Sequence, residues 1–173
     1  MCLIGRWWLK CALPAILCLV VWVPADAQAQ GSSVPILKVS GEVSSPLQLS
    51  AADFAKLPRT STKAKDHSGK ESVFEGVSLV EILKLAGLKF GEELRGKQMA
   101  LFLVVDAADG YRVVFALPEL DPSFNDKLVL LADHRDGSPL ATHDGPLQII
   151  VPAEKRQGRW IRQVVSLTVR RAE

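Results

Sequence analysis

The chain carries short apolar runs of strand length, bounded by residues that favour turns. The clearest runs are Met99 to Val105, Leu128 to Ala132 and Leu147 to Val151. Ala107 to Gly110 separates the first run from Tyr111 to Ala116, which predicts an antiparallel hairpin. Continuous apolar runs this short are typical of buried strands. The sequence therefore predicts a core built around β-sheet.

Further strands are predicted at both ends of this region. Ile36 to Val43 has the composition of a strand, and the turn residues after it lead into a short return strand, Leu47 to Leu49. Val164 to Arg170 alternates apolar and polar residues, which predicts a strand with one face in water. Asp136 and Gly137 mark a turn between the two later buried strands.

Two short helices interrupt the strands. Ser50 lies three residues before Asp53, an N-cap arrangement that begins a helix, and Pro58 ends it. Ser78 to Glu81 forms a capping-box pattern for a second helix, which Gly87 ends. One face of that helix carries Leu79, Ile82, Leu83 and Ala86. Short helices without βαβ spacing predict the α+β class, with a mixed or antiparallel sheet.

The first 30 residues resemble a secretory signal peptide. Arg6 and Lys10 precede a mostly apolar stretch, Cys11 to Val23, and small residues follow up to Ala29. A helix of that stretch spans about 20 Å, whereas a bilayer core needs about 30 Å, so a permanent anchor is the weaker interpretation. Cleavage is expected after residue 27 or after residue 29. The protein is therefore expected to be exported, to the periplasm or outside the cell.

Export would leave one domain over residues 34–173, without cysteine. All three cysteines, Cys2, Cys11 and Cys18, lie in the predicted signal peptide. Disulfides, thiolate nucleophiles and zinc sites on sulfur are therefore not expected in the mature chain. The net charge of the whole chain is +2, which is too small an excess to favour nucleic acid as a partner. No permanent membrane span is expected after cleavage.

The segment Arg59 to Ser72 is too polar for a core and predicts an exposed hairpin that turns at Asp66 to Gly69.

In order along the chain, short motifs resemble the sulfite-oxidase-type oxidoreductase molybdopterin-binding domain family. The motifs are Val39 to Val43 with Pro46, Leu49 to Pro58, Gly76 to Leu79 with Ile82-Leu83 and Ala86-Gly87, Asp109 to Tyr111, Asp136 to Leu140, Gly145 to Leu147 with Val151-Pro152, and Arg159-Trp160. The resemblance implies that family's α+β fold, with molybdopterin as a possible cofactor.

The chain departs from the family pattern where the family holds its metal. In the family's enzymes a cysteine thiolate ligates molybdenum between the first helix and the Gly-Val-x-Leu motif, which corresponds here to Arg59 to Glu75, and this segment has no cysteine. Gln148 stands where relatives tend to carry an arginine, and Asp144 displaces His143 from the family's His-Gly position. Other side chains do not reproduce the ligand properties of a soft thiolate.

Basic residues in two segments form the candidate cofactor site. If the family fold brings the late loop near the early hairpin, Lys155, Arg156, Arg159 and Arg162 join Lys63 and Lys65 around an anion. Guanidinium and ammonium groups suit a pterin phosphate or an oxyanion. The other interpretation is a solvated basic loop. The predicted cofactor-binding residues are Lys63, Lys65, His143, Lys155, Arg156, Arg159 and Trp160, with Trp160 either capping the pocket or filling the core.

Metal binding by side chains has little support. The three histidines, His67, His134 and His143, each adjoin an aspartate, at positions 66, 133 and 144, but none shows the spacing of a metal motif. Ser138 has no nucleophile-elbow pattern around it. No side-chain catalytic residue is predicted.

Three functions remain open. The leading hypothesis is a ligand-binding or partner-binding module on the molybdopterin-binding fold, without molybdenum turnover. The second is a genuine molybdopterin-dependent oxidoreductase in which the metal has no cysteine ligand. The third is a purely structural or signalling domain. Arg6-Trp7 is not a twin arginine, so the chain is expected to cross the membrane unfolded and without a preassembled cofactor.

Overall fold

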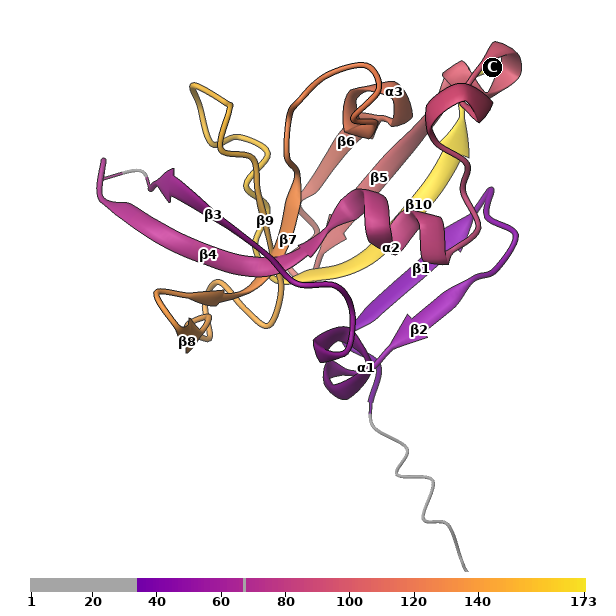
Figure 1. The fold of residues 1–173 in the computed structure, drawn as a ribbon. Helices are drawn as coiled ribbons and strands as arrows, with labels where there is room; N and C mark the ends of the chain where they lie inside the picture. Colours follow the sequence, from indigo (N-terminus) through magenta and orange to yellow (C-terminus); the bar gives the residue numbers. More distant parts are fainter. Residues whose placement is uncertain (1–33, 67) are drawn as a thin grey trace, which may run out of the picture. The chain divides into compact units, whose positions relative to one another are not determined.

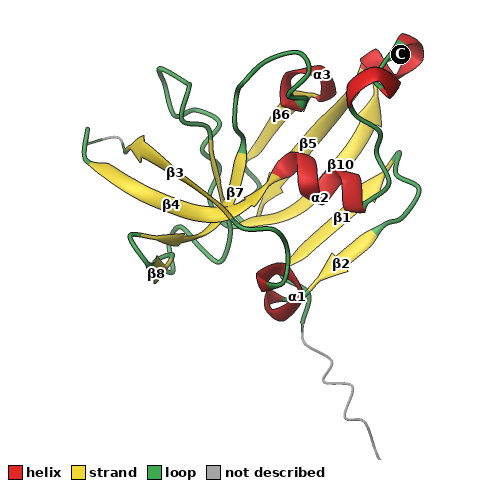
Figure 2. Cartoon of the chain, in the orientation of Figure 1, coloured by secondary structure: helices red, strands yellow, loops and turns green. Residues whose placement is uncertain are grey.

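The structure is a computed structural model that describes residues 34–66 and 68–173. The predicted signal peptide and its cleavage site lie outside the described residues. Within the described part of the chain, no helix is long and apolar enough to cross a membrane. Figure 2 shows that short helices connect a fold made mainly of strands.

One sheet brings together strands from both ends of the described chain (Figure 1). The strand order is β2-β1-β10-β5-β6. The strands are β1 (Leu37–Gly41), β2 (Leu47–Leu49), β5 (Leu101–Ala107), β6 (Arg112–Ala116) and β10 (Val164–Arg171). β1 pairs in parallel with β10, and the other neighbours are antiparallel. The prediction of the α+β class with a mixed or antiparallel sheet is confirmed, and this sheet is mixed.

A second, antiparallel sheet follows the order β3-β4-β7-β8, and β9 also pairs with β7. The strands are β3 (Thr60–Lys65), β4 (Glu71–Ser78), β7 (Leu130–Arg135), β8 (Ser138–Pro139) and β9 (Gln148–Ile150). The polar hairpin predicted over Arg59 to Ser72 corresponds to β3 and the start of β4, which continues to Ser78. β3 forms the edge of this sheet. Its outer side is therefore free to meet a loop.

Several strands differ by a few residues from the sequence prediction, and β5 and β7 are shifted towards the C-terminus. Met99 lies in a 3-10 helix, and β5 begins at Leu101. β7 begins at Leu130 and continues through polar residues as far as Arg135, because these residues pair with β4 and β8. An apolar pattern cannot reveal a strand whose second half is polar.

The helices are short. They are α1 (Ala51–Ala55), α2 (Leu79–Leu85) and α3 (Leu117–Leu120), with 3-10 turns η1 (Gly91–Glu93) and η2 (Gly96–Ala100). The predicted cap of α1 is confirmed: the backbone N–H of Asp53 donates to Ser50 Oγ at 3.2 Å, and the Asp53 carboxylate accepts from the Ser50 N–H at 3.3 Å. These bonds satisfy amides that a helix start leaves without partners.

The predicted capping box of α2 is wrong in its hydrogen bonds, although Ser78 is the N-cap residue. The Ser78 side chain makes no capping bond, and Glu81 instead pairs with Lys84 at 2.9 Å. The N–H of Leu79 donates to the carbonyl of Val129 at 3.0 Å. A nearby segment of the same chain thus provides the acceptor for one of the amides at the helix start.

The core is one hydrophobic cluster with contributions from both sheets and from α2. The predicted inward residues of α2, Leu79, Ile82 and Leu83, are fully buried. β4 and β7 approach closely at Gly76, where an added Cβ would lie 2.0 Å from the carbonyl oxygen of Leu131. Glycine is required there, because any side chain would separate the two strands.

Candidate functional site

A cavity of about 800 Å³ lies between β3 and the loop of residues 152–160. β3 contributes Lys63, Ala64 and Lys65, and the loop contributes Lys155 and Arg156. The remaining lining residues are Asp66, Glu71, Pro152, Glu154, Gln157, Gly158 and Trp160. The structure therefore places the early hairpin and the late loop around one cavity.

Side-chain bonds from three directions hold the loop in place. Gln157 Nε2 donates to the carbonyl of Lys65, which ties the loop to β3. The hydroxyl of Tyr111 donates to the carbonyl of Gly158 at 2.9 Å. The indole N–H of Trp160 donates to the carbonyl of Val151 at 3.1 Å. A loop that is held in this way loses little conformational entropy when a ligand binds to its charged side chains.

Trp160 is a buried residue that also borders the large cavity. It is 9% exposed and packs edge to face against Phe74, with ring centroids 5.8 Å apart. It also lines the 800 Å³ cavity and two smaller neighbouring cavities. The indole ring is therefore both a core residue and a shared wall.

The charges that face the large cavity are mostly positive. Lys63, Lys65, Lys155 and Arg156 form no ion pair with another described residue. Three acidic residues also line the cavity. Two of them, Asp66 and Glu154, are each ion-paired with an arginine that lies outside the cavity lining. Glu71 alone among the lining acids has no such described partner. The cavity therefore carries an excess of positive charge.

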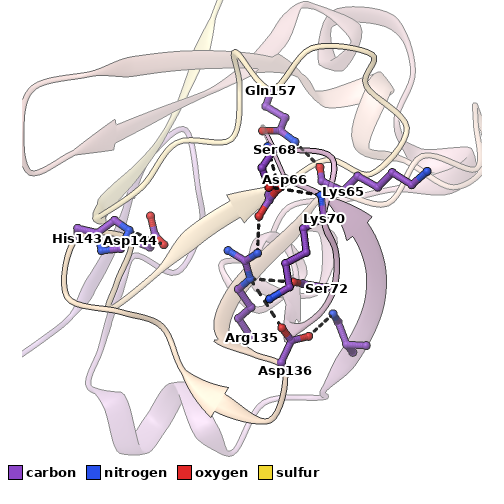
Figure 3. A network of polar contacts seen from close by, with 11 residues as sticks. Lys65, Asp66, Ser68, Lys70, Ser72, Arg135, Asp136, His143, Asp144 and Gln157 are labelled. Carbon is purple, nitrogen blue, oxygen red and sulfur yellow. Dashed lines mark hydrogen bonds and ion pairs between the residues drawn. The ribbon is translucent and has the colours of Figure 1, made fainter.

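Asp66 is the centre of the polar network in Figure 3. Its carboxylate accepts bonds from the Ser68 hydroxyl at 2.5 Å, from the Lys70 N–H at 3.1 Å, and from Arg135 Nη2 at 2.6 Å. The Ser68 hydroxyl and the Arg135 guanidinium hold the pKa of Asp66 well below its usual range. The network joins the β3–β4 turn to β7, and so supports one wall of the cavity.

Arg159 lies behind the opposite wall. Its Nε donates to Glu154 Oε1 at 2.7 Å, its Nη2 bonds to the same oxygen, and its Nη1 donates to Glu119 at 2.9 Å. The guanidinium stacks over Phe115, 4.4 Å from the ring centroid. Arg159 is not among the residues that line the large cavity.

His143 and Arg162 lie on the other side of the Trp160 wall. They line neighbouring cavities of about 260 and 470 Å³. Asp144 lies between them, with its carboxylate 3.2 Å from His143 Nε2 and 3.4 Å from Arg162 Nε. Of the predicted residues, the structure therefore brings Lys63, Lys65, Lys155, Arg156 and Trp160 together, and places His143 and Arg159 elsewhere.

Asp133 lies close to the neighbouring His134 and is also paired with an arginine. His134 Nδ1 lies 3.0 Å from Asp133, whose carboxylate also binds Arg59 Nη2 at 2.6 Å. His67 lies outside the described residues. Among residues 34–66 and 68–173, no three histidine, cysteine, aspartate or glutamate side chains cluster as metal ligands.

The sequence analysis did not identify Arg135 or Glu119 as part of the site. Arg135 is 69 residues from Asp66, and Glu119 is 40 residues from Arg159. Arg135 ends the polar half of β7, and Glu119 lies in the short helix α3. Nothing in the local sequence distinguishes either residue from an ordinary exposed charge. The pairing depends on which strands become neighbours.

Comparison with known proteins agrees with this fold. The profile described as "Oxidoreductase molybdopterin binding domain" matches residues 32–173. The crystal structure of the sulfane dehydrogenase SoxCD from Paracoccus pantotrophus superposes with a TM-score of 0.61 at 22% identity. The match covers 77% of this chain and 37% of that chain. The comparison with curated proteins finds no significant match. The chain belongs to the oxidoreductase molybdopterin-binding domain family.

Proposed function

We propose that this chain is an exported module that binds a small phosphate-bearing organic anion, such as a pterin phosphate, and works without molybdenum redox turnover. One observation carries the proposal. Four basic side chains without ion-pair partners among the described residues surround a cavity of about 800 Å³. Like charges held close together repel each other, so an anion that binds among them is stabilised.

The lining fits only part of what the family's cofactor requires. Lys63, Lys65, Lys155 and Arg156 suit the phosphate of a molybdopterin, because ammonium and guanidinium groups form charge-assisted bonds to phosphate oxygens. Ala64, the buried residue that β3 contributes to the cavity wall, is apolar and offers no metal ligand. The chain's three cysteines all precede residue 19. The donor set therefore fits an anionic organic group and does not fit thiolate ligation of a metal.

The cavity also suits an organic ligand rather than a bare inorganic ion. A volume of about 800 Å³ lies within the range of about 300–1,000 Å³ that is typical of small-molecule sites. The indole of Trp160 supplies an aromatic wall beside the basic residues. The N-terminal sequence supports a location outside the cytoplasm for this function. The alternative ligand is a partner protein.

The test is a titration of the full chain with phosphate, sulfite, molybdate and a pterin phosphate, at low and then moderate salt. Binding of a specific ligand should saturate and should raise the melting temperature. At one hundred times the dissociation constant, the ligand should increase the free energy of unfolding by about 2.7 kcal/mol. Trp160 emission should change, and Trp160→Phe separates this signal from the three N-terminal tryptophans. Effects that vanish as salt rises would indicate only a solvated basic loop.

Matched variants locate the binding site. Lys63→Gln and Lys155→Gln should each weaken binding about fivefold, the effect of one unit charge about 4 Å from an anion in water. Lys38→Gln removes an exposed charge from β1, away from the cavity lining, and should leave the affinity unchanged.

Two results would overturn the proposal. Stoichiometric molybdenum in protein purified from its native compartment would support a genuine oxidoreductase with non-cysteine ligation. Absence of binding by all four ligands would leave the structural or signalling function. Intact mass of the exported protein tests the export claim, because a chain that retains Cys18 has not been cleaved at the expected site.

A further inference from the structure

The two walls of the large cavity share one arrangement. Each wall presents a carboxylate, Asp66 on the hairpin and Glu154 on the loop. Each carboxylate is bound by an arginine that does not line the cavity, Arg135 and Arg159 respectively. Both arginines therefore neutralise a wall carboxylate from outside the ligand's space.

Aromatic rings in the core hold both arginines in position. Arg135 lies over Phe74, 5.3 Å from the ring centroid, and Arg159 lies over Phe115 at 4.4 Å. Both rings are fully buried. A guanidinium that stacks on a fixed ring keeps its donors aimed in one direction. The arginines are thus fixed to the fold and not to the ligand.

Arg159 is more strongly engaged with the cavity carboxylate than with its second partner. Two of its nitrogens, Nε and Nη2, bind the same oxygen of Glu154, whereas Glu119 receives only Nη1. Glu119 does not line the cavity, and it also accepts the N–H of Ala116 at 2.8 Å. Loss of Arg159 would therefore expose an uncompensated negative charge mainly through Glu154.

We propose that Arg159 is a positioning residue that sets the charge selectivity of the cavity: it neutralises Glu154 and so favours multiply charged anions, without touching the anion itself. The inference rests on the proposed anion-binding function. It assigns Arg159 a role different from that of Lys155 and Arg156, although the three are close in sequence. Because Coulomb energy scales with ligand charge, the effect of Arg159 must grow with the charge of the anion.

The experiment measures the affinity of the full chain for inorganic pyrophosphate and inorganic phosphate by isothermal titration calorimetry. Arg159→Gln should weaken pyrophosphate binding about tenfold and phosphate binding by a smaller factor, as expected for a unit charge a few ångströms from the anion. The double variant Arg159→Gln/Glu154→Gln should return to within about twofold of the parent, because the exposed charge is gone. Glu154→Gln alone should bind no more weakly than the parent.

Two conservative variants separate this role from a structural one. Arg159→Lys keeps a cation beside Glu154 and should retain most of the affinity, even if Arg159→Gln folds poorly. Glu119→Gln removes the partner outside the cavity lining and should bind like the parent. Thermal unfolding of each variant shows whether a loss of affinity accompanies a loss of fold.

Several outcomes would contradict the inference. A weakened Arg159→Gln that Glu154→Gln does not rescue would mean that Arg159 contacts the anion or only supports the loop. An unchanged Arg159→Gln, or equal losses for phosphate and pyrophosphate, would remove the selectivity role. If the parent binds a pterin phosphate but neither inorganic anion, this inference fails and the proposed function stands. If the parent binds none of the three, both fail. If the parent binds and the rescue is missing, only this inference fails.

Discussion

Leu83 offers the most direct test of how α2 is packed. Leu83 is 0% exposed and belongs to the central hydrophobic cluster. Leu83→Ala removes roughly three carbon atoms, which at about 0.8 kcal/mol per buried group amounts to about 2.4 kcal/mol of transfer free energy. The cavity left behind adds a further term, so the free energy of unfolding should fall by about 2 to 5 kcal/mol.

Leu85 on the same helix is a matched control. It is 48% exposed, so Leu85→Ala should change stability by less than about 0.5 kcal/mol. Urea unfolding followed by far-UV circular dichroism measures both variants. The midpoint should shift for Leu83→Ala with little change in the slope. Equal losses for the two variants, or a loss below about 0.5 kcal/mol for Leu83→Ala, would refute the inward orientation of this helix face.

Two further predictions concern the hairpin. Gly76→Ala should lower the free energy of unfolding by about 1 to 3 kcal/mol or more, because its Cβ would meet the backbone of Leu131. As a control, Gly158→Ala places its Cβ in open space and should leave the free energy of unfolding nearly unchanged in the same assay. The low pKa of Asp66 means that its ionised form stabilises the fold above the unfolded pKa of about 3.9, and that this stabilisation is lost as pH falls towards the folded value. Asp66→Asn should therefore be less stable than the parent at neutral pH, with a gap that narrows below about pH 4 in acid titrations followed by circular dichroism; a gap independent of pH would contradict the assignment.

Local patterns predicted the elements whose residues obey local rules. The cap at Ser50 and the inward face of α2 depend on spacing within a few residues, and the structure has both. The hairpin of β3 and β4 follows from a polar segment with turn residues at its centre. The capping bonds of Ser78 were predicted wrongly, because a carbonyl from the distant residue Val129 satisfies an amide at the helix start.

The candidate site divides in the same way. The basic residues of the hairpin and of the late loop are visible in the sequence, and their meeting around one cavity is a property of the fold. The sequence does not reveal that Arg159 is ion-paired whereas Lys155 and Arg156 are not paired with any described residue. Its partner Glu154 is five residues away in the sequence, but Glu119 and Phe115, which it also contacts, belong to another part of the chain.

The sequence by itself determined the α+β class, the positions of most strands and of α1 and α2, and the absence of cysteine beyond residue 18. Composition and periodicity act over a few residues, so they can be read without the fold. Only the tertiary structure decided which charges face the cavity. Ion pairs such as Arg135 with Asp66 join residues 69 positions apart, and strand order and register bring them together. The net charge of a site is a sum over neighbours in space, so the number of basic residues in a loop does not reveal which of them remain available to a ligand.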